Sequence, residues 1–367
     1  MVRTFGGQNR RLRRFAKCFK QIRGISVLIP YWLRQSVENS KTGQTVVLDV
    51  REYFYARYFY SFVKFLCLEG FQVRMRPDPA TLYALNRAQY GNLVLSEKLV
   101  KLSCKSEGAV SIGDYDSDKK LLPFDFDKSV RPGGEEAFDV PMAQHPVMYS
   151  RGYWNAPIDS ALPRRNAIVF IGNPEHEIYS SLGSDGVFAV ITRVRLWELL
   201  QGARRCSKVF DEGEISASRE GVVLVDSRVC KIPYERFRKT VGGFRFFLCA
   251  PGAFMPLCHN LIEALSVGTI PVIEAKYASL LYPALVHREN AIVFKDEIDL
   301  IIKIEECLHL DDMEAQRLCA NVLAYYEAYL TPAAVVRRVM DPSVKVVRML
   351  AGNYSVQLFR ERLARNA

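Results

Sequence analysis

Three polar side chains at one end of a predicted helix have the types and spacing that suit a nucleotide ligand. His259 and Asn260 stand at the start of this helix, and Glu263 follows one turn later. Imidazole and amide N–H groups donate to phosphate oxygens, and a carboxylate accepts hydrogen bonds from the hydroxyls of a ribose. We therefore expect these three residues to contact the nucleotide part of a ligand.

The elements around this helix place it at the edge of a parallel sheet. A strand predicted over 244–249 leads through a loop with proline and glycine into the helix, which ends at Gly268 before a strand over 269–273. In α/β sheets, ligands bind outside the carboxyl ends of the strands, where a helix N-terminus offers backbone N–H groups to phosphate. Taken alone the helix is weak support, because a helix ending in glycine before a buried strand is common in α/β proteins.

The pattern E-A-L-x-x-G-x-x-P-V-I, from Glu263 to Ile273, resembles the donor-site signature of GT-B glycosyltransferases. Within that class it is most similar to exostosin-type enzymes and to bacterial transferases of Kdo (3-deoxy-octulosonic acid). The resemblance covers about residues 164–335. It implies an α/β GT-B fold, in which two Rossmann-like domains face a central cleft. His259 and Asn260, where exostosins commonly have an arginine and an aromatic residue, favour the Kdo-type branch, which uses a CMP-activated sugar.

The resemblance also implies other donor-site residues. Arg165 precedes the strand with which the second half begins, and Gly172 and Asn173 close that strand. GT-B enzymes usually offset phosphate charge with helix dipoles and basic residues, so we expect no metal ion and no cofactor beside the nucleotide-sugar co-substrate. The basic candidates are Arg165, Arg193, Arg195 and Lys276.

Glycosyl transfer needs a carboxylate or imidazole near the anomeric carbon, as a base in an inverting enzyme or as a nucleophile in a retaining one. Asp114 and Asp116 directly follow a strand predicted over 109–112, at the sheet edge where ligands bind. The alternative for each acid is a solvated loop carboxylate or a helix cap. The catalytic candidates, in order, are Asp114 and Asp116, then His145, then Asp49 and Glu52.

The order of expected elements divides the chain into two α/β halves. Strands, among them a short one over 92–95, alternate with helices up to residue 112. The region over 121–163 is rich in proline and glycine and shows no clean period, so we predict long loops and the linker between the domains there. The alternation restarts at residue 167. This order is typical of parallel sheets wound by crossover helices. The predicted parts are a basic arm over 1–24, an acceptor domain over 25–160, a donor domain over 161–340 and a C-terminal helix over 341–367.

Most of the net charge of +10 lies in the basic arm, which has eight Lys and Arg residues, with no acid before Glu38. The rest of the chain is nearly balanced, which argues against nucleic acid as a partner. Leu12, Phe15 and Phe19 stand at helical spacing among these charges. The arm is therefore either solvated or a helix that lies on an anionic membrane surface.

Composition bounds the location and the class of function. No segment reaches the ~18–20 apolar residues of a membrane span, and nine scattered cysteines without a CxxC pair indicate reduced thiols. We predict a cytoplasmic protein, peripheral on the inner face of the membrane. Its predicted activity is transfer of a sugar, Kdo from CMP-Kdo in the Kdo-type branch, to a cell-surface glycan or glycolipid acceptor. The alternative is a non-catalytic glycan-binding module on the same fold.

Overall fold

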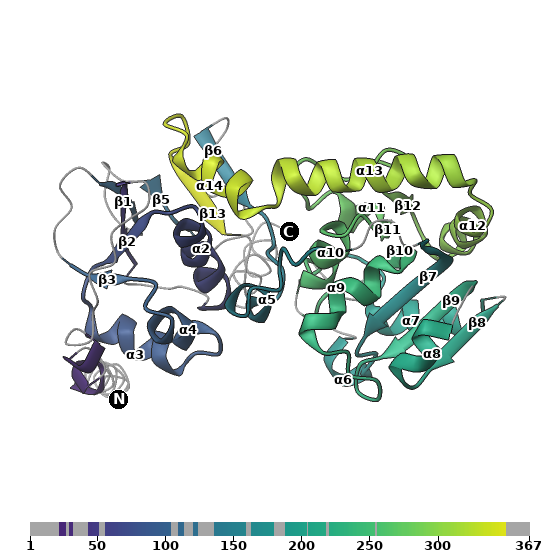
Figure 1. Cartoon of the computed structure of the whole chain (residues 1–367), viewed down its shortest axis with the longest axis horizontal. Coiled ribbons are helices and arrows are strands. Elements are labelled where there is room, and N and C mark those ends of the chain that lie inside the picture. The colour runs from purple at the N-terminus through teal and green to yellow at the C-terminus, as the bar shows by residue number, and fades with distance from the viewer. Residues whose placement is uncertain are drawn as a thin grey trace, which may run out of the picture. The chain divides into compact units, whose positions relative to one another are not determined.

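The structure is a computed structural model, whose elements are labelled in Figure 1. It describes residues 22–349 apart from 27–28, 32–42, 51–55, 104–108, 114–119, 124–135, 159–162, 180–187, 204, 218–219 and 254. Asp114, Asp116, Glu52 and most of the basic arm therefore lie outside the described residues. The chain forms two compact units. Unit 1 consists of Met1–Val140 and Val335–Ala351, and unit 2 of Pro141–Ala334 and Gly352–Ala367.

Unit 1 is built on a seven-stranded sheet of order β3-β2-β1-β4-β5-β13-β6, in which every pairing is parallel. The inner strand β1 is almost wholly buried, as expected when both faces of a parallel sheet are covered. Helix α2 supplies large buried side chains, among them Phe59, Tyr60 and Phe62. The elements are β1 Thr45–Asp49, α2 Ala56–Leu68, β2 Gln72–Met75, α3 Pro79–Arg87, α4 Gly91–Ser96, β3 Lys101–Leu102, β4 Val110–Gly113, β5 Lys120–Leu121, β6 Ala137–Val140 and β13 Val346–Met349.

Strand β13 replaces the start of the helix predicted over 341–367. It lies between β5 and β6, and Val346–Met349 pair in register with Ala137–Val140. Its valines favour a strand, and the buried guanidinium of Arg348 is paired with Asp139 at 3.0 Å. The helix prediction is wrong for these four residues because the partner strands are far away in the sequence. Residues 350–367 lie outside the described part of the chain.

Unit 2 is built on a six-stranded sheet of order β12-β11-β10-β7-β9-β8, again parallel at every pairing. Its core joins the sheet to α7, α12 and the long helix α13 at the top of Figure 1. The elements are α5 Pro146–Ser150, β7 Arg165–Gly172, α6 His176–Tyr179, α7 Arg193–Gln201, β8 Cys206–Val209, α8 Glu212–Ala217, β9 Gly221–Asp226, α9 Tyr234–Gly242, β10 Phe244–Leu248, α10 His259–Leu265, β11 Ile270–Glu274, α11 Ala275–Ala278, β12 Ile292–Phe294, α12 Glu297–Leu308, α13 Asp312–Tyr329 and α14 Pro332–Met340, which crosses into unit 1.

The strand order of unit 2 creates a switch point between β7 and β10. After β7 the chain builds β8 and β9 on one side, and from β10 onward it builds the other side. Crossover connections that run in opposite directions leave a crevice at the carboxyl ends of the two strands, where α/β sheets bind ligands. Helix α10 begins at this edge, since it follows β10 and precedes β11.

The predicted α/β class, with a Rossmann-like parallel sheet in each half, is confirmed by these two sheets. Two local predictions are wrong. Residues 92–95, predicted as a short strand, belong to α4, and the region over 121–163, predicted as loops, contains β6 and α5. Both errors concern short apolar runs, which do not distinguish a strand from a buried helix.

The units divide at Val140/Pro141 and Ala334/Val335, whereas the sequence analysis placed the domain limits at 160/161 and 340/341. The first difference has a visible cause. Gln144 Nε2 donates to the Tyr326 hydroxyl of α13 at 2.9 Å and to the Trp154 carbonyl at 3.1 Å. These buried contacts hold the stretch around α5 within unit 2.

Candidate functional site

The start of α10 holds an imidazole and a carboxylate that interact closely. His259 Nδ1 lies 3.1 Å from each carboxylate oxygen of Glu263, one helical turn further on. The Glu263 side chain is 2% exposed and that of His259 is 26% exposed. A carboxylate only accepts hydrogen bonds, so this contact assigns the proton of the His259 ring to Nδ1. The other ring nitrogen, Nε2, then carries the lone pair of the neutral ring.

His145 joins this pair from the N-terminus of α5. Its backbone N–H donates to Glu263 Oε1 at 2.9 Å, and its Nδ1 accepts from the Val147 N–H at 3.3 Å. The His145 ring stacks on Tyr234 at 4.6 Å between centroids and meets the His259 ring edge-on at 5.0 Å. The sequence analysis proposed His145 as a catalytic residue of the first half. The structure instead places it in unit 2, beside the donor-site candidates.

Glu263 is engaged differently from what the sequence analysis expected. A ribose would need its carboxylate to be reachable, but Glu263 is buried and already accepts from the His145 N–H and the His259 ring. A buried carboxylate with two such donors is well satisfied within the protein. Its influence on a ligand therefore passes through His259.

Asn260 ties α10 to the neighbouring strand rather than pointing to a ligand with its amide N–H. Its Nδ2 donates to the carbonyl of Ile171 in β7 at 3.1 Å. Its Oδ1 is buried and has no hydrogen-bond partner among the described residues. The bond links the two strand ends that flank the switch point, because α10 begins just beyond β10.

Gly172 and Asn173 lie at the carboxyl end of β7, as the sequence analysis expected. The Arg193 guanidinium lies beside Gly172, since a Cβ built on this glycine would stand 3.4 Å from Arg193 Nη1. The Asn173 side chain folds back on its own loop, where it accepts from the Glu175 N–H at 2.9 Å. Asn173 thus shapes the turn after β7.

Arg193 is a buried cation at this same edge. It begins α7 after the N-cap Thr192 and is 5% exposed. Its Nε donates to the Pro251 carbonyl at 3.1 Å, Nη2 lies 3.5 Å from Cys258 Sγ, and the guanidinium stands 4.1 Å from the centre of the Tyr179 ring. No carboxylate among the described residues forms an ion pair with it. A buried guanidinium without a counter-charge is costly, which points to an anionic ligand here.

Arg165 does not belong to this site. It begins β7, whereas Gly172 ends it, and an eight-residue strand separates its two ends by roughly 23 Å. The Arg165 guanidinium donates to the Gly243 and Ile215 carbonyls and lies 3.9 Å from the centre of the Phe244 ring. Burial lowers its pKa. The structure therefore places Arg165 at the opposite end of β7 from Gly172, although the two are close in sequence, and donor binding by Arg165 stays a prediction.

Lys276 lies at the correct edge, beyond β11, but its Nζ donates to the Ala189 carbonyl at 2.7 Å. Glu274, the last residue of β11, accepts from the Ile191 N–H at 2.8 Å. Together the two side chains hold the segment that leads into Arg193. The sequence analysis did not name Glu274, although an acid at the end of a buried strand indicates a candidate functional residue. Burial raises the pKa of this carboxyl.

The candidate catalytic acids of unit 1 belong to the carboxyl ends of its strands, and Asp49 is the one that lies among the described residues. Gly113 ends β4 directly before Asp114 and Asp116, and a Cβ on it would meet the Asp49 carbonyl oxygen at 2.5 Å. The Asp49 side chain is almost fully buried at the end of β1 and lies 3.4 Å from Arg76. Strands β1 and β4 are neighbours at the point where the strand order of this sheet changes direction, and Asp49 lies at the carboxyl end of β1 there.

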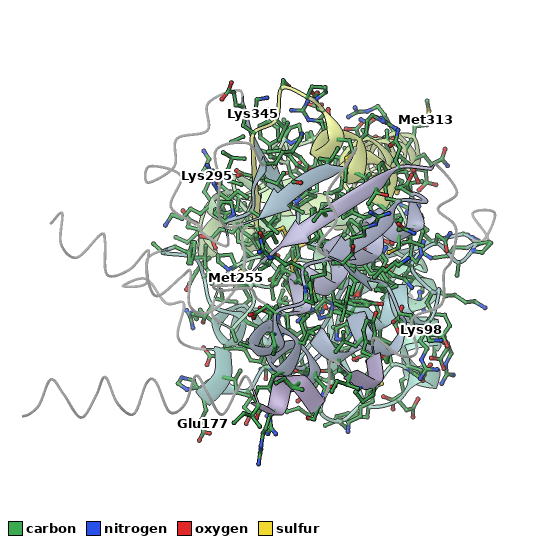
Figure 2. All side chains as sticks on the ribbon, turned by 90° about the vertical axis from the view of Figure 1, so that its left-hand side faces the viewer. Lys98, Glu177, Met255, Lys295, Met313 and Lys345 are labelled. Atoms are coloured by element: carbon green, nitrogen blue, oxygen red, sulfur yellow. The ribbon has the colours of Figure 1, made fainter. Side chains whose placement is uncertain are left out.

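The described residues lack two features that would suggest other kinds of site. They contain no cluster of three or more His, Cys, Asp or Glu side chains placed to hold a metal ion. None of their helices combines the length and apolarity needed to cross a bilayer. Met255, which Figure 2 labels, belongs to the loop before α10.

No protein-family model matches the chain, and no curated protein does. Similar solved structures include WaaG, a glycosyltransferase involved in lipopolysaccharide biosynthesis, at 11% identity over 81% of this chain and 100% of that chain, with a TM-score of 0.38. HepE of Anabaena, with UDP and glucose, is 8% identical over 80% and 98%, with a TM-score of 0.43. The sucrose-phosphate synthase of Thermosynechococcus elongatus is 11% identical over 88% and 100%, with a TM-score of 0.37. With TM-scores below 0.5, these likenesses leave the function to be argued from the chain's own residues.

Proposed function

We propose that this chain is a GT-B glycosyltransferase whose unit 2 holds a nucleotide-sugar donor. The observation that carries the proposal is Arg193, a buried guanidinium that lacks an ion-pair partner among the described residues. It stands where the ends of β7 and β10 meet the start of α10. A phosphate at this switch point supplies the missing negative charge and receives a charge-assisted hydrogen bond.

The donor is fixed by residues from several elements. Arg193 binds its phosphate, and the His259 ring, held by Glu263, contributes a second polar group at the start of α10. The aromatic pair of His145 and Tyr234 borders His259 and provides a flat surface beside it. The His259–Asn260 pair favours CMP-Kdo as the donor. A basic side chain, rather than a metal ion, offsets the phosphate charge in this proposal.

Unit 1 presents the acceptor. Asp114 or Asp116 acts at the anomeric carbon or on the acceptor hydroxyl, since both follow the end of β4 at the sheet edge. A base takes the proton of the acceptor hydroxyl, whereas a nucleophile forms a glycosyl ester that the acceptor then attacks. His145 is the imidazole candidate for proton transfer, with its Nε2 3.5 Å from the Tyr234 hydroxyl.

The acceptor in this proposal is a cell-surface glycan or glycolipid, reached from the cytoplasmic face of a membrane. The basic arm over 1–24 provides positive charge for an anionic surface. Ile22 and Ile25, at its described end, are exposed on a helical segment three residues apart. Exposed apolar side chains beside a basic run suit insertion between lipid headgroups.

Incubation with a panel of nucleotide-sugars, CMP-Kdo and UDP-glucose among them, tests the proposal through released nucleotide. We expect one donor to release nucleotide in an acceptor-dependent way. Arg193→Met, which keeps the buried volume, should abolish this release. Arg195→Gln is the matched control, because Arg195 lies on the same helix but is exposed and paired with Glu297. Binding of a glycan without release from any donor supports the non-catalytic module instead.

A further inference from the structure

The guanidinium of Arg193 is held at one edge and lacks an acceptor at the other. Its Nε donates to the Pro251 carbonyl at 3.1 Å, and its Nη2 lies 3.5 Å from Cys258 Sγ, a weak acceptor. Nη1 lies beside Gly172, the last residue of β7. Among the described residues, no side chain or carbonyl accepts a hydrogen bond from Nη1. The Nη1 edge is therefore the part of this buried cation that remains for a ligand.

The flat face of the same guanidinium is covered by an aromatic ring. The Arg193 guanidinium carbon stands over the Tyr179 ring, 4.1 Å from the ring centre. Tyr179 is the last residue of α6, a single turn of helix without any buried residue. Because α6 contributes no buried side chain to the core, packing does not explain an aromatic residue at this position. Stacking on the guanidinium does explain it.

The turn after β7 sets the position of this ring. The Asn173 side chain accepts from the Glu175 N–H at 2.9 Å and donates to the Glu175 carboxylate at 3.2 Å. The Tyr179 N–H then donates to the Glu175 carbonyl at 3.0 Å. Asparagine side chains that bond to the backbone two residues further on stabilise a tight turn. The end of β7 and the Tyr179 ring therefore belong to one short, hydrogen-bonded segment.

We propose that Tyr179 is a positioning residue of the donor site, whose ring fixes the plane of the Arg193 guanidinium so that the Nη1 edge donates to a phosphate oxygen of the donor. The inference rests on the proposed function and adds to it the residue that orients the phosphate-binding cation. No covalent bond forms or breaks in this step. The phosphate supplies the acceptor and the negative charge that the Nη1 edge lacks among the described residues.

The physical cause is the planarity of the guanidinium. Its N–H groups all lie in one plane, and a hydrogen bond weakens steeply when the donor points away from the acceptor. A single strong bond, from Nε to the Pro251 carbonyl, leaves the plane free to turn about the axis of that bond. An aromatic ring against the face opposes this turning, because the π face attracts the cation and contacts it best when the two are flat on each other.

Three variants separate positioning by the ring from simple filling of space. Tyr179→Leu keeps an apolar side chain at this place but removes the π face. Tyr179→Phe keeps the π face and removes only the hydroxyl. Ile178→Ala is the matched control, because Ile178 is the preceding residue of the same turn and is 41% exposed.

Calorimetric titration of the full chain measures donor affinity, with UDP-glucose and CMP-Kdo as separate probes. We expect Tyr179→Leu to weaken binding of the donor about tenfold, the size expected for loss of a desolvated cation–π contact. Tyr179→Phe should restore the affinity, and Ile178→Ala should match the wild type. In an Arg193→Met background, Tyr179→Leu should cause no further loss, since the ring then has no guanidinium to orient.

The last comparison is the readout that a merely structural role would not reproduce. If Tyr179 only filled space, Tyr179→Leu would weaken binding by the same factor with and without Arg193. Thermal unfolding of each variant without ligand shows that it is folded before it is titrated. If Tyr179→Leu does not fold, Tyr179→Gln, which suits a partly exposed turn, takes its place in the same comparison.

The outcomes distinguish this inference from the proposed function. The inference is overturned, and the proposed function stands, if Arg193→Met weakens donor binding but Tyr179→Leu binds like the wild type or loses the same factor in both backgrounds. A Tyr179→Phe variant as weak as Tyr179→Leu overturns it too, because the ring face is then not what matters. If the wild type binds neither nucleotide-sugar, or Arg193→Met binds as tightly as the wild type, the proposed function fails and the inference fails with it.

Discussion

The side-chain amide of Asn260 donates to the Ile171 carbonyl at 3.1 Å and so joins the first turn of α10 to strand β7. This bond spans the switch point of the unit 2 sheet. The amide oxygen of the same residue is buried without a partner among the described residues, which costs free energy in the unliganded protein. Asn260 therefore combines a useful bond with an unsatisfied acceptor.

Asn260→Ala should change the free energy of unfolding by no more than about 1 kcal/mol, because the lost bond is offset by removal of the unsatisfied oxygen. Donor affinity should fall more clearly, since α10 is no longer tied to β7. Urea denaturation and calorimetric titration measure the two effects. A large loss of stability with unchanged donor affinity would show that Asn260 serves the fold alone.

Arg193→Met should weaken donor binding at least about tenfold while leaving the unliganded protein as stable as before, or more stable. The reason is that an unpaired buried charge is replaced by an apolar side chain of similar length. Thermal unfolding of the unliganded protein measures the stability, and titration with the donor measures the affinity. Arg195→Gln is the control for both. Loss of stability in Arg193→Met would mean that the guanidinium stabilises the fold through its Pro251 contact.

Glu274→Gln should raise stability near neutral pH and have no effect in acid. Burial raises the pKa of Glu274 above its usual value, so the folded state binds the proton more tightly than the unfolded state does. Stability is therefore lost as pH rises from the unfolded value towards the raised folded value, and stays lower above it. Glutamine keeps an acceptor for the Ile191 N–H without this charge. Urea midpoints at about pH 7 and about pH 4 test the sign, and a difference of the same size at both pH values contradicts it.

A comparison of Asp114→Asn with Asp116→Asn should show which of the two carboxylates is catalytic. The variant that removes the acting carboxylate should lose about 100-fold or more of the transfer rate with unchanged donor affinity. Mass spectrometry without acceptor distinguishes the mechanisms, because a nucleophile leaves a sugar adduct and a base does not. If both variants turn over normally, Asp49→Asn is the next test, as this buried acid ends the adjacent strand β1.

Deletion of residues 1–24 should abolish binding to anionic vesicles and preserve transfer to a soluble acceptor analogue. The deletion removes eight basic residues, which attract an anionic surface by about 1 kcal/mol each. Sedimentation with phosphatidylserine vesicles and with neutral phosphatidylcholine vesicles measures the difference. Equal sedimentation of the full and shortened chains would rule out the arm as the membrane contact.

Local signals predicted the part of the fold that carries the site. The run from β10 through α10 to β11 has an apolar strand, a loop with proline and glycine, and a helix that ends in glycine, all within thirty-one residues from Phe244 to Glu274. Such signals act over neighbouring residues and are visible in one sequence. The alternation of strands and helices likewise predicted two parallel sheets.

The relations that the sequence did not predict are those between distant residues. Arg165 was placed with Gly172 because the two are near in sequence, yet a strand separates them. The approach of His145 to Glu263 links residues 118 positions apart, and no local pattern encodes it. Tertiary packing decides such contacts, so one sequence does not show how the candidate residues are arranged.

Strand β13 has a consequence for the order in which the molecule can be built. Because Val346–Met349 lie between β5 and β6, the sheet of unit 1 stays incomplete until these four residues have left the ribosome. All six strands of the unit 2 sheet are synthesised before that point. Unit 2 can therefore complete its sheet during translation. Until β13 is made, the sheet of unit 1 lacks the strand between β5 and β6. A chain that ended before residue 346 would accordingly lack one strand of the unit 1 sheet, whereas its unit 2 sheet would have all six strands.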